Sequence, residues 1–251
     1  MRFDESLAFK RDPYRFIAKR CRQIASDVYE TRLFLRKTTC VTGPAAAQLF
    51  YDGERFVRHG AAPEPLQKTL LGVGGVQSLD GAPHQHRKAM FLALMAPGRV
   101  RELADAFRDE LRMALAQWQD QEQIVLYDAL QPVLTRAVCK WSGVPLEPRE
   151  IARRTKQLTA LFDATGRFPA HFKSRLDRTR AEDWAAGLIE NLRLGAITPS
   201  AHTALREIAL HRDLEGQLLP AQTAAVELLN VLRPTVAVSE AMAEMCRSQR
   251  V

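Results

Sequence analysis

The sequence has few cysteines, no long hydrophobic run and no leader-like start, and each absence excludes a class of protein. Its four cysteines, Cys21, Cys40, Cys139 and Cys246, are scattered without a CxxC pair, which indicates reduced thiols and not a disulfide framework or a zinc site. No run approaches the roughly 20 apolar residues that cross a bilayer, so no membrane span is expected. The chain begins with Met-Arg-Phe-Asp-Glu, which has acids where a signal peptide has its apolar core. We therefore expect a cytoplasmic protein.

Acidic residues are fewer than basic ones, and the net charge is +7. The basic residues nevertheless alternate with acids along amphipathic segments such as residues 101–110, and the chain has no arginine-rich arm or aromatic stacking motif. We interpret most of this charge as solvated helix faces and expect no nucleic acid as partner. A basic, nucleic-acid-binding helical protein remains the weaker alternative, whereas an anionic small ligand or an acidic redox partner fits the same charge.

The hydrophobic periodicity predicts a mainly α-helical fold with a small β-sheet near the N-terminus. An amphipathic helix is expected from Asp12-Pro13 to about Val28, a β-type run over 31–41, a short helix over 44–50 and a long loop over 51–80. Residues 124–127 are compatible with one short strand. Further helices are expected over 83–95, 98–119, 127–142, 147–163, 173–194, 201–212 and 220–244. With no repeat or long linker, a single domain over 1–251 is the simplest prediction.

An arginine–proline pair lies inside the last apolar helix. Residues 223–238 are apolar on nearly all sides, which is typical of a helix inside a domain. Arg233 cannot remain unpaired in such a place, because desolvating a lone charge costs at least several kcal/mol. Glu227 is on a different side of the helix, and Pro234 removes one N–H from the ladder. A carboxylate socket is one interpretation. The commoner alternative is an ion pair with an acid from another element.

A second signal is the basic start of the helix predicted over 83–95. His84, Arg87 and Lys88 occupy its first turns, with His84 and Lys88 one turn apart on the same face. Cations are disfavoured at a helix N-terminus, so an anion bound there would explain them. Exposed basic residues that tolerate a weak dipole term explain them equally well. A two-histidine metal site with His86 is disfavoured, because His84 and His86 point to different faces.

Taken together, these segments resemble one protein family. The stretch 72–88, the segments 91–95 and 182–184, and residues 228–237 with the sequence Leu-Leu-Asn-Val-Leu-Arg-Pro-Thr-Val-Ala are similar to the bacterial fatty-acid peroxygenase branch of the cytochromes P450. The resemblance runs from the N-terminus to about Ser239, and residues 240–251 form a divergent, more polar tail. It implies a P450-like helical fold and an oxidoreductase that contains haem b.

The resemblance also implies roles for individual residues. His84 and Lys88 match the residues that bind the haem propionates. Arg233 matches the arginine that binds the fatty-acid carboxylate, and Pro234 stands where monooxygenases of this fold have an acid–alcohol pair. Gln77 and Leu71 match positions of the substrate pocket.

The implied reaction is oxidation of a fatty acid at its α or β carbon by hydrogen peroxide, without an obligate redox partner. Proton transfer during O–O cleavage normally requires an acid–base group within hydrogen-bond reach. The resemblance implies that the substrate carboxylate held by Arg233 serves as that group. Holding the carboxylate also fixes which carbon faces the oxidant.

The chain lacks the segment that carries the axial thiolate in this family. Glu244 to Arg247 fits the family's Glu-x-x-Arg motif by letter only, and Cys246 has no glycine-rich loop before it, so we reject it as the haem ligand. We therefore expect a truncated P450-like domain that is inactive alone. A non-catalytic helical module that binds fatty acids or other anions is the main alternative, and a remnant without a stable fold is another.

Overall fold

The computed structural model of this chain describes residues 4–61, 67, 71–163 and 170–248. Internal contacts divide the chain into two compact units, Met1–Val57 (unit 1) and Arg58–Val251 (unit 2). The grouping of both units into one incomplete domain stays a prediction. Within the described residues, no helix is both long enough and apolar enough to cross a bilayer.

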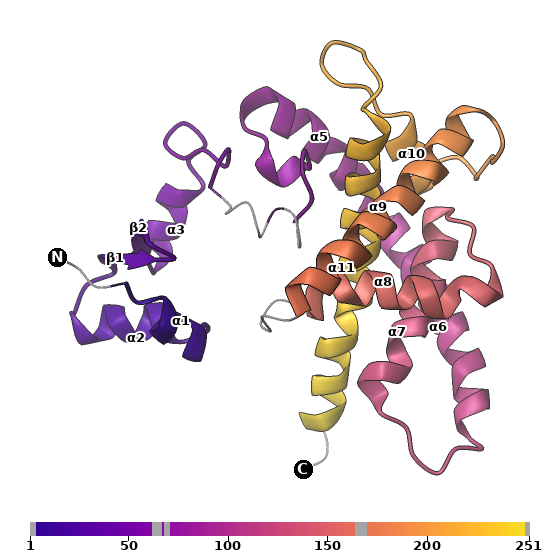
Figure 1. Cartoon of the computed structure of the whole chain (residues 1–251), viewed down its shortest axis with the longest axis horizontal. Helices are drawn as coiled ribbons and strands as arrows, with labels where there is room; N and C mark the ends of the chain where they lie inside the picture. The colour runs from indigo at the N-terminus through magenta and orange to yellow at the C-terminus, as the bar shows by residue number, and fades with distance from the viewer. Residues whose placement is uncertain (1–3, 62–66, 68–70, 164–169, 249–251) are drawn as a thin grey trace. The chain divides into compact units, whose positions relative to one another are not determined.

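Unit 1 contains a β-hairpin and three short helices (Figure 1). Its strands pair antiparallel, with Val28 opposite Val41 and Leu33 opposite Arg36. One face of the hairpin packs on a small core in which Phe16, Leu33 and Cys40 are buried. The elements are α1 (Ser6–Arg11), α2 (Phe16–Gln23), β1 (Val28–Leu33), β2 (Arg36–Val41) and α3 (Pro44–Phe50). The predicted small sheet and the helix over 44–50 are thus confirmed.

Unit 2 is helical, and α11 runs through it (Figure 1, yellow). Helix α11 packs against α7, α8, α9 and α10, and most of its first sixteen residues are buried. This central position confirms the prediction of a helix inside the domain. The elements of the unit are η2 (Val76–Ser78), α5 (Gly81–Leu94), α6 (Pro97–Trp118), α7 (Leu126–Ser142), η3 (Pro148–Glu150), α8 (Ile151–Asp163), α9 (Ala170–Arg193), α10 (Ala204–Ala209) and α11 (Ala221–Ser248).

Two predicted elements are wrong. The helix expected from Asp12 to Val28 is shorter at both ends: α2 begins at Phe16, because the chain turns at Asp12-Pro13, and it ends at Gln23, while Val28 already belongs to β1. The preceding helix α1 was not expected. The short strand expected over 124–127 does not form, and α7 begins at Leu126 instead. A lone strand there would leave its backbone N–H and C=O groups without ladder partners. The loop expected over 51–80 contains the short helix η2, and its residues 62–66 and 68–70 lie outside the described residues.

Candidate functional site

Arg233 and Pro234 lie in the middle of α11. The Arg233 side chain is part-buried and Pro234 is exposed. Because proline has no N–H, the carbonyl of Asn230 receives no helical hydrogen bond from position 234. The partly or fully exposed face of α11 continues through Ala237 and Val238 and is apolar. Arg233 therefore carries its charge on the border between a buried core and an apolar helix face.

A second guanidinium increases the positive charge around Arg233. Burial first, and then the nearby charge of Arg178, lower the pKa of Arg233 to about 10. Arg178 is a buried residue of α9 and pairs with Glu182 one turn later, with 2.6 Å between Arg178 Nε and Glu182 Oε1. Burial and the like charge of Arg178 thus both disfavour the charged form of Arg233, while Glu182 offsets part of the Arg178 charge.

The loop that carries Leu71 and Gln77 lies directly on α11. Gly72 has a φ of +86°, and a Cβ added there would be 2.5 Å from Val226 Cγ1. A Cβ on Gly75 would be 3.0 Å from the same atom. Only glycine lets the backbone approach the helix so closely. The close approach places part-buried Leu71 beside Gly72 and positions Gln77 against α11.

Gln77 belongs to a hydrogen-bonded network centred on a buried acid. Asn230 Nδ2 donates to Gln77 Oε1 at 3.3 Å and to Glu227 Oε2 at 3.0 Å. Arg87 Nη1 of α5 donates to Glu227 Oε1 at 3.2 Å and to the carbonyl of Gly74 at 3.0 Å. The Glu227 side chain is fully buried, and burial raises its pKa despite the opposing effects of Asn230 and Arg87. The network connects the loop, α5 and α11.

The basic residues at the start of α5 differ in whether they have an acidic partner. Arg87 has an internal partner in Glu227, whereas His84 and Lys88 have no ion pair with any acid of the described chain. Burial lowers the pKa of His84, and the charges of Arg58 and Lys88 lower it further against the opposing charge of Asp80. The first turn of α5 contains no acid. His84 and Lys88 are thus available to bind an anion such as a carboxylate.

The Asp80 carboxylate at the N-cap is held by other groups. It accepts hydrogen bonds from the backbone N–H groups of Arg58 and His59, at 2.7 and 2.9 Å. These bonds hold the pKa of Asp80 below its ordinary value. Asp80 therefore fixes the entry to α5 and does not neutralise its basic side chains by hydrogen bonding.

None of the described cysteines lies in a glycine-rich loop of the kind expected for a haem thiolate. Cys139 is in the core, where burial raises the pKa of its thiol to about 12. Cys246 is exposed on α11 itself, and Cys21 and Cys40 are buried in unit 1. The described part of the chain also contains no group of three or more side chains that could hold a metal ion. Within the described residues, basic side chains that could hold carboxylates are present, but a cysteine placed to ligate a haem iron is not found.

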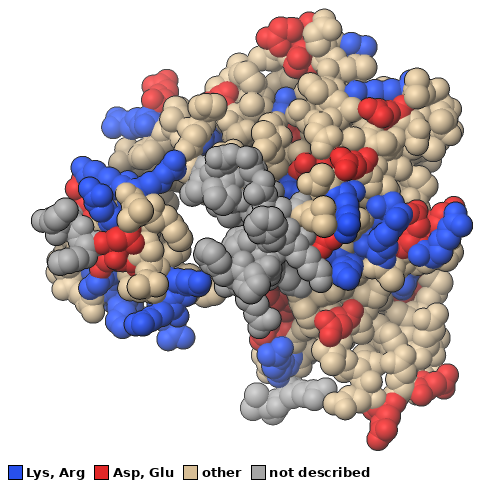
Figure 2. Space-filling view, viewed as in Figure 1, with Lys and Arg blue, Asp and Glu red and all other residues tan. Residues whose placement is uncertain are grey.

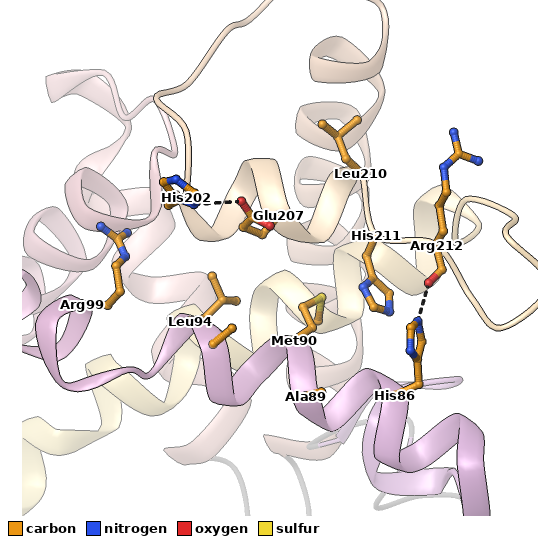
Figure 3. Close-up of a pocket in the computed structure, with 11 residues that line it drawn as sticks. His86, Ala89, Met90, Leu94, Arg99, His202, Glu207, Leu210, His211 and Arg212 are labelled. Carbon is orange, nitrogen blue, oxygen red and sulfur yellow. Dashed lines mark hydrogen bonds and ion pairs between the residues drawn. The ribbon is translucent and has the colours of Figure 1, made fainter.

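A separate cavity of about 630 Å³ lies between α5 and residues 202–212 (Figure 3). None of the six predicted site residues lines it. His86 and His211 lie next to each other in its wall with ring centroids 5.0 Å apart, and His86 Nε2 is 2.8 Å from the carbonyl oxygen of Arg212. Met90 and Leu94 form part of its apolar wall. His86 therefore belongs to a different surface of α5 from His84, as its sequence position predicts.

Sequence reasoning missed Arg178 and did not pair Arg87 with Glu227. Arg178 and the Arg87–Glu227 pair come from elements far apart in the chain, and no local pattern connects them. A weak signal existed for Arg178, since Glu182 follows it by four residues, the spacing of a helical ion pair. Glu227 was recognisable as a lone acid in an apolar helix, and such an acid requires a partner.

Comparison with known proteins gives similarity to solved cytochromes P450. Cytochrome P450SP alpha (CYP152B1) in complex with (R)-ibuprophen is 51% identical over 94% of this chain, with a TM-score of 0.92. Cytochrome P450EX alpha (CYP152N1) with myristic acid is 42% identical with a TM-score of 0.89, and a variant of cytochrome P450 OleT in complex with arachidonic acid is 27% identical with a TM-score of 0.90. No protein-family model matches the chain.

These alignments cover 57% or 58% of the relatives' own chains, so this chain spans about three fifths of their length. A further structure of cytochrome P450SP alpha aligns over 99% of this chain with a TM-score of 0.97, so both units have counterparts in it. Sequence identity and fold agree with the resemblance seen in residues 72–88 and 228–237. The chain belongs to the CYP152 branch of the cytochromes P450, the fatty-acid peroxygenase branch.

Proposed function

We propose that this chain provides the substrate-binding, haem-facing part of a fatty-acid peroxygenase that oxidises the α or β carbon. The observation that carries this proposal is Arg233, a part-buried guanidinium beside Arg178 on a central helix. Its relatives include structures with myristic acid and arachidonic acid, both of which have a carboxylate head. A cytoplasmic location, without nucleic acid or an obligate redox partner, is proposed with this function.

Each predicted site residue would have its own role in binding the fatty acid. Arg233 binds the fatty-acid carboxylate through its planar fork, which orients the chain and fixes the carbon presented for oxidation. Gln77 and Leu71 line the substrate side, where the loop packs on α11. Pro234 has no proton to give, so the bound carboxylate itself moves the proton within reach of the oxidant.

His84 and Lys88 would hold the haem propionates at the first turns of α5. Bound haem b would supply the iron at which hydrogen peroxide is activated. Among the described residues neither side chain has an ion pair with an acid, and the helix N-terminus adds its own partial positive charge. Together they favour carboxylates over neutral groups.

Arg233 is tested by measuring binding of myristic acid to the 251-residue chain by calorimetry. Arg233→Leu removes a charged hydrogen-bond donor, and we expect affinity to fall by about ten- to hundredfold, since such bonds contribute roughly 1.5–3 kcal/mol. Arg206→Leu, at an exposed position of α10, is the matched control and should leave affinity unchanged. Equal losses in both variants would contradict the assignment of the carboxylate site.

A second candidate, a module that binds fatty acids without catalysis, is favoured by the positions of the four cysteines. Cys139 is buried in the core of unit 2, Cys246 is exposed on α11 itself, and Cys21 and Cys40 are buried in unit 1. We therefore expect the chain reconstituted with haem to show no thiolate-type band in the reduced carbon monoxide spectrum. Such a band would refute this expectation, and fatty-acid binding without the band would favour the binding module.

A further inference from the structure

The tip of the β-hairpin in unit 1 adopts a backbone conformation that its residues disfavour. Phe34 and Leu35 have φ angles of 53° and 62°, both in the left-handed region. Tight hairpin turns of this kind are normally formed by Asn-Gly or Asp-Gly, because bulky side chains are strained there. The backbone N–H of Leu35 donates to Asp4 Oδ2 at 2.7 Å, and that of Phe34 donates to Ser6 Oγ at 2.5 Å. The turn is thus held in a strained form.

Packing inside the unit does not account for the two side chains. Leu35 is 79% exposed and Phe34 is 63% exposed, although Phe34 contacts Phe9 edge-to-face at 6.3 Å between ring centroids. Leu7, in the adjoining helix α1, is 75% exposed. Three large apolar side chains therefore project into solvent from one end of a small unit. Strained residues without internal compensation point to a function outside the fold.

Cations surround this apolar tip. Arg32 and Lys37 stand directly opposite each other across the strands, and like charges in that position destabilise a hairpin. Lys37 has an acidic partner, with Glu30 Oε1 3.4 Å from its Nζ, while Asp4 acts on Arg32 only at longer range. Arg36 follows the tip directly.

The same excess of positive charge extends over the rest of unit 1, where Figure 2 shows many Lys and Arg side chains on the visible face. Some of its exposed basic residues form no ion pair with an acid among the residues described for this unit: Lys10, Arg11, Arg15, Lys19, Arg22, Arg32 and Arg36.

We propose that the hairpin tip of unit 1 binds the surface of an anionic lipid bilayer. Phe34 and Leu35 would enter the headgroup region, and Arg32, Arg36 and Lys37 would contact the phosphates. Exposed apolar side chains ringed by cations are the pattern of interfacial binding, whereas a nucleic-acid surface offers no apolar layer for a leucine. This inference concerns residues 4–37 alone and does not depend on the haem chemistry.

The test is sedimentation of the full chain with vesicles of phosphatidylcholine containing about 30% phosphatidylglycerol, compared with phosphatidylcholine alone. We expect binding to the anionic vesicles that weakens as salt rises from about 0.05 to 0.5 M. Arg36→Gln should lower the partition coefficient about fivefold, the effect of one cation near such a surface. Leu35→Asn should lower it at least about tenfold, since the apolar anchor is lost.

The double variant Phe34→Asn with Leu35→Gly separates binding from folding. It installs residues that favour the turn, so its thermal transition should be at least as high as that of the unchanged chain while vesicle binding is lost. Leu194→Asn, at an exposed leucine of unit 2, and Arg149→Gln are the matched controls and should bind normally.

Three outcomes would overturn the proposal. One is equal binding to anionic and neutral vesicles, and another is retained binding by the double variant. The third is salt-dependent binding to a short DNA duplex without binding to vesicles, which would assign the same cations to nucleic acid. Phe34→Trp provides an independent measurement by fluorescence. The emission maximum of the tryptophan should shift to shorter wavelength when anionic vesicles are added, but not when neutral vesicles are added.

Discussion

The buried pair of Arg87 and Glu227 permits a quantitative prediction about stability. Its charged atoms are 3.2 Å apart, with side-chain exposures of 12% and 0%. At an effective dielectric constant near 20, Coulomb attraction at this distance is roughly 5 kcal/mol, an upper bound for their coupling. Breaking one side of a buried pair costs about 3–5 kcal/mol, because the remaining charge is left desolvated.

A double-mutant cycle with Arg87→Met and Glu227→Gln measures the coupling. We expect each single variant to lose about 3 kcal/mol of unfolding free energy and the double variant to lose clearly less than the sum, with a coupling of about 2–3 kcal/mol. Unfolding in urea, followed by circular dichroism, gives the free energies. The exposed pair of Arg247 and Glu244, 3.1 Å apart on α11, is the control and should couple by less than about 1 kcal/mol.

The pH dependence of the Arg87→Met variant provides a second check with a definite sign. Burial raises the pKa of Glu227 above its value in the unfolded chain, so its contribution to stability is complete at low pH and is lost as pH rises through the folded-state pKa. Without Arg87 that pKa rises further. The stability deficit of Arg87→Met should therefore shrink as pH falls from about 7 toward 5, whereas that of Glu227→Gln should not. A coupling below about 0.5 kcal/mol would refute the assignment of a functional buried pair.

Two further predictions concern backbone space and histidine titration. Gly72→Ala should destabilise the chain by about 2 kcal/mol or more in urea unfolding, because the added methyl meets Val226 at a positive φ, whereas Gly187→Ala, with open space inside α9, should stabilise it by up to about 1 kcal/mol. Burial, and then the charges of His86 and Arg87, lower the pKa of His211. As pH drops from about 7 to 5, position 211 therefore takes up a proton more readily in the unfolded chain than in the folded one, and the free energy of unfolding falls. His211→Gln should flatten that fall, and an unchanged slope would contradict the buried, neutral histidine.

Local patterns in the sequence predict most of the helices. The ends that the apolar periodicity predicts for α5, α6 and α7 lie within two residues of the observed ends, because residues that start or stop helices stand near the limits of each. It failed at Asp12-Pro13, where a proline expected inside the first turn of a helix marks the break between two helices instead. Residues 124–127 failed for a related reason, since an apolar run cannot be a strand without a neighbour to pair with.

The candidate site was predictable as a set of residues but not as a set of contacts. The pattern of α11 identified Arg233 and Pro234, and the basic start of α5 identified His84 and Lys88. The sequence could not predict which basic residue of α5 pairs with a buried acid, because Glu227 is 140 residues from Arg87 in the chain. Only the packing of α5 on α11 decides it.

Helix α11 separates its charges, and this separation supports the proposed carboxylate site at Arg233. Residues 227 and 233 are six positions apart, which turns them by about 120° around a helix of 3.6 residues per turn. Glu227 therefore faces α5 and is neutralised by Arg87, while Arg233 faces elsewhere, within range of the charge of Arg178. Had the acid been four residues from Arg233, the two would have paired within the helix. Within the described part of α11, the spacing of six therefore keeps its buried acid, Glu227, on a different side of the helix from Arg233.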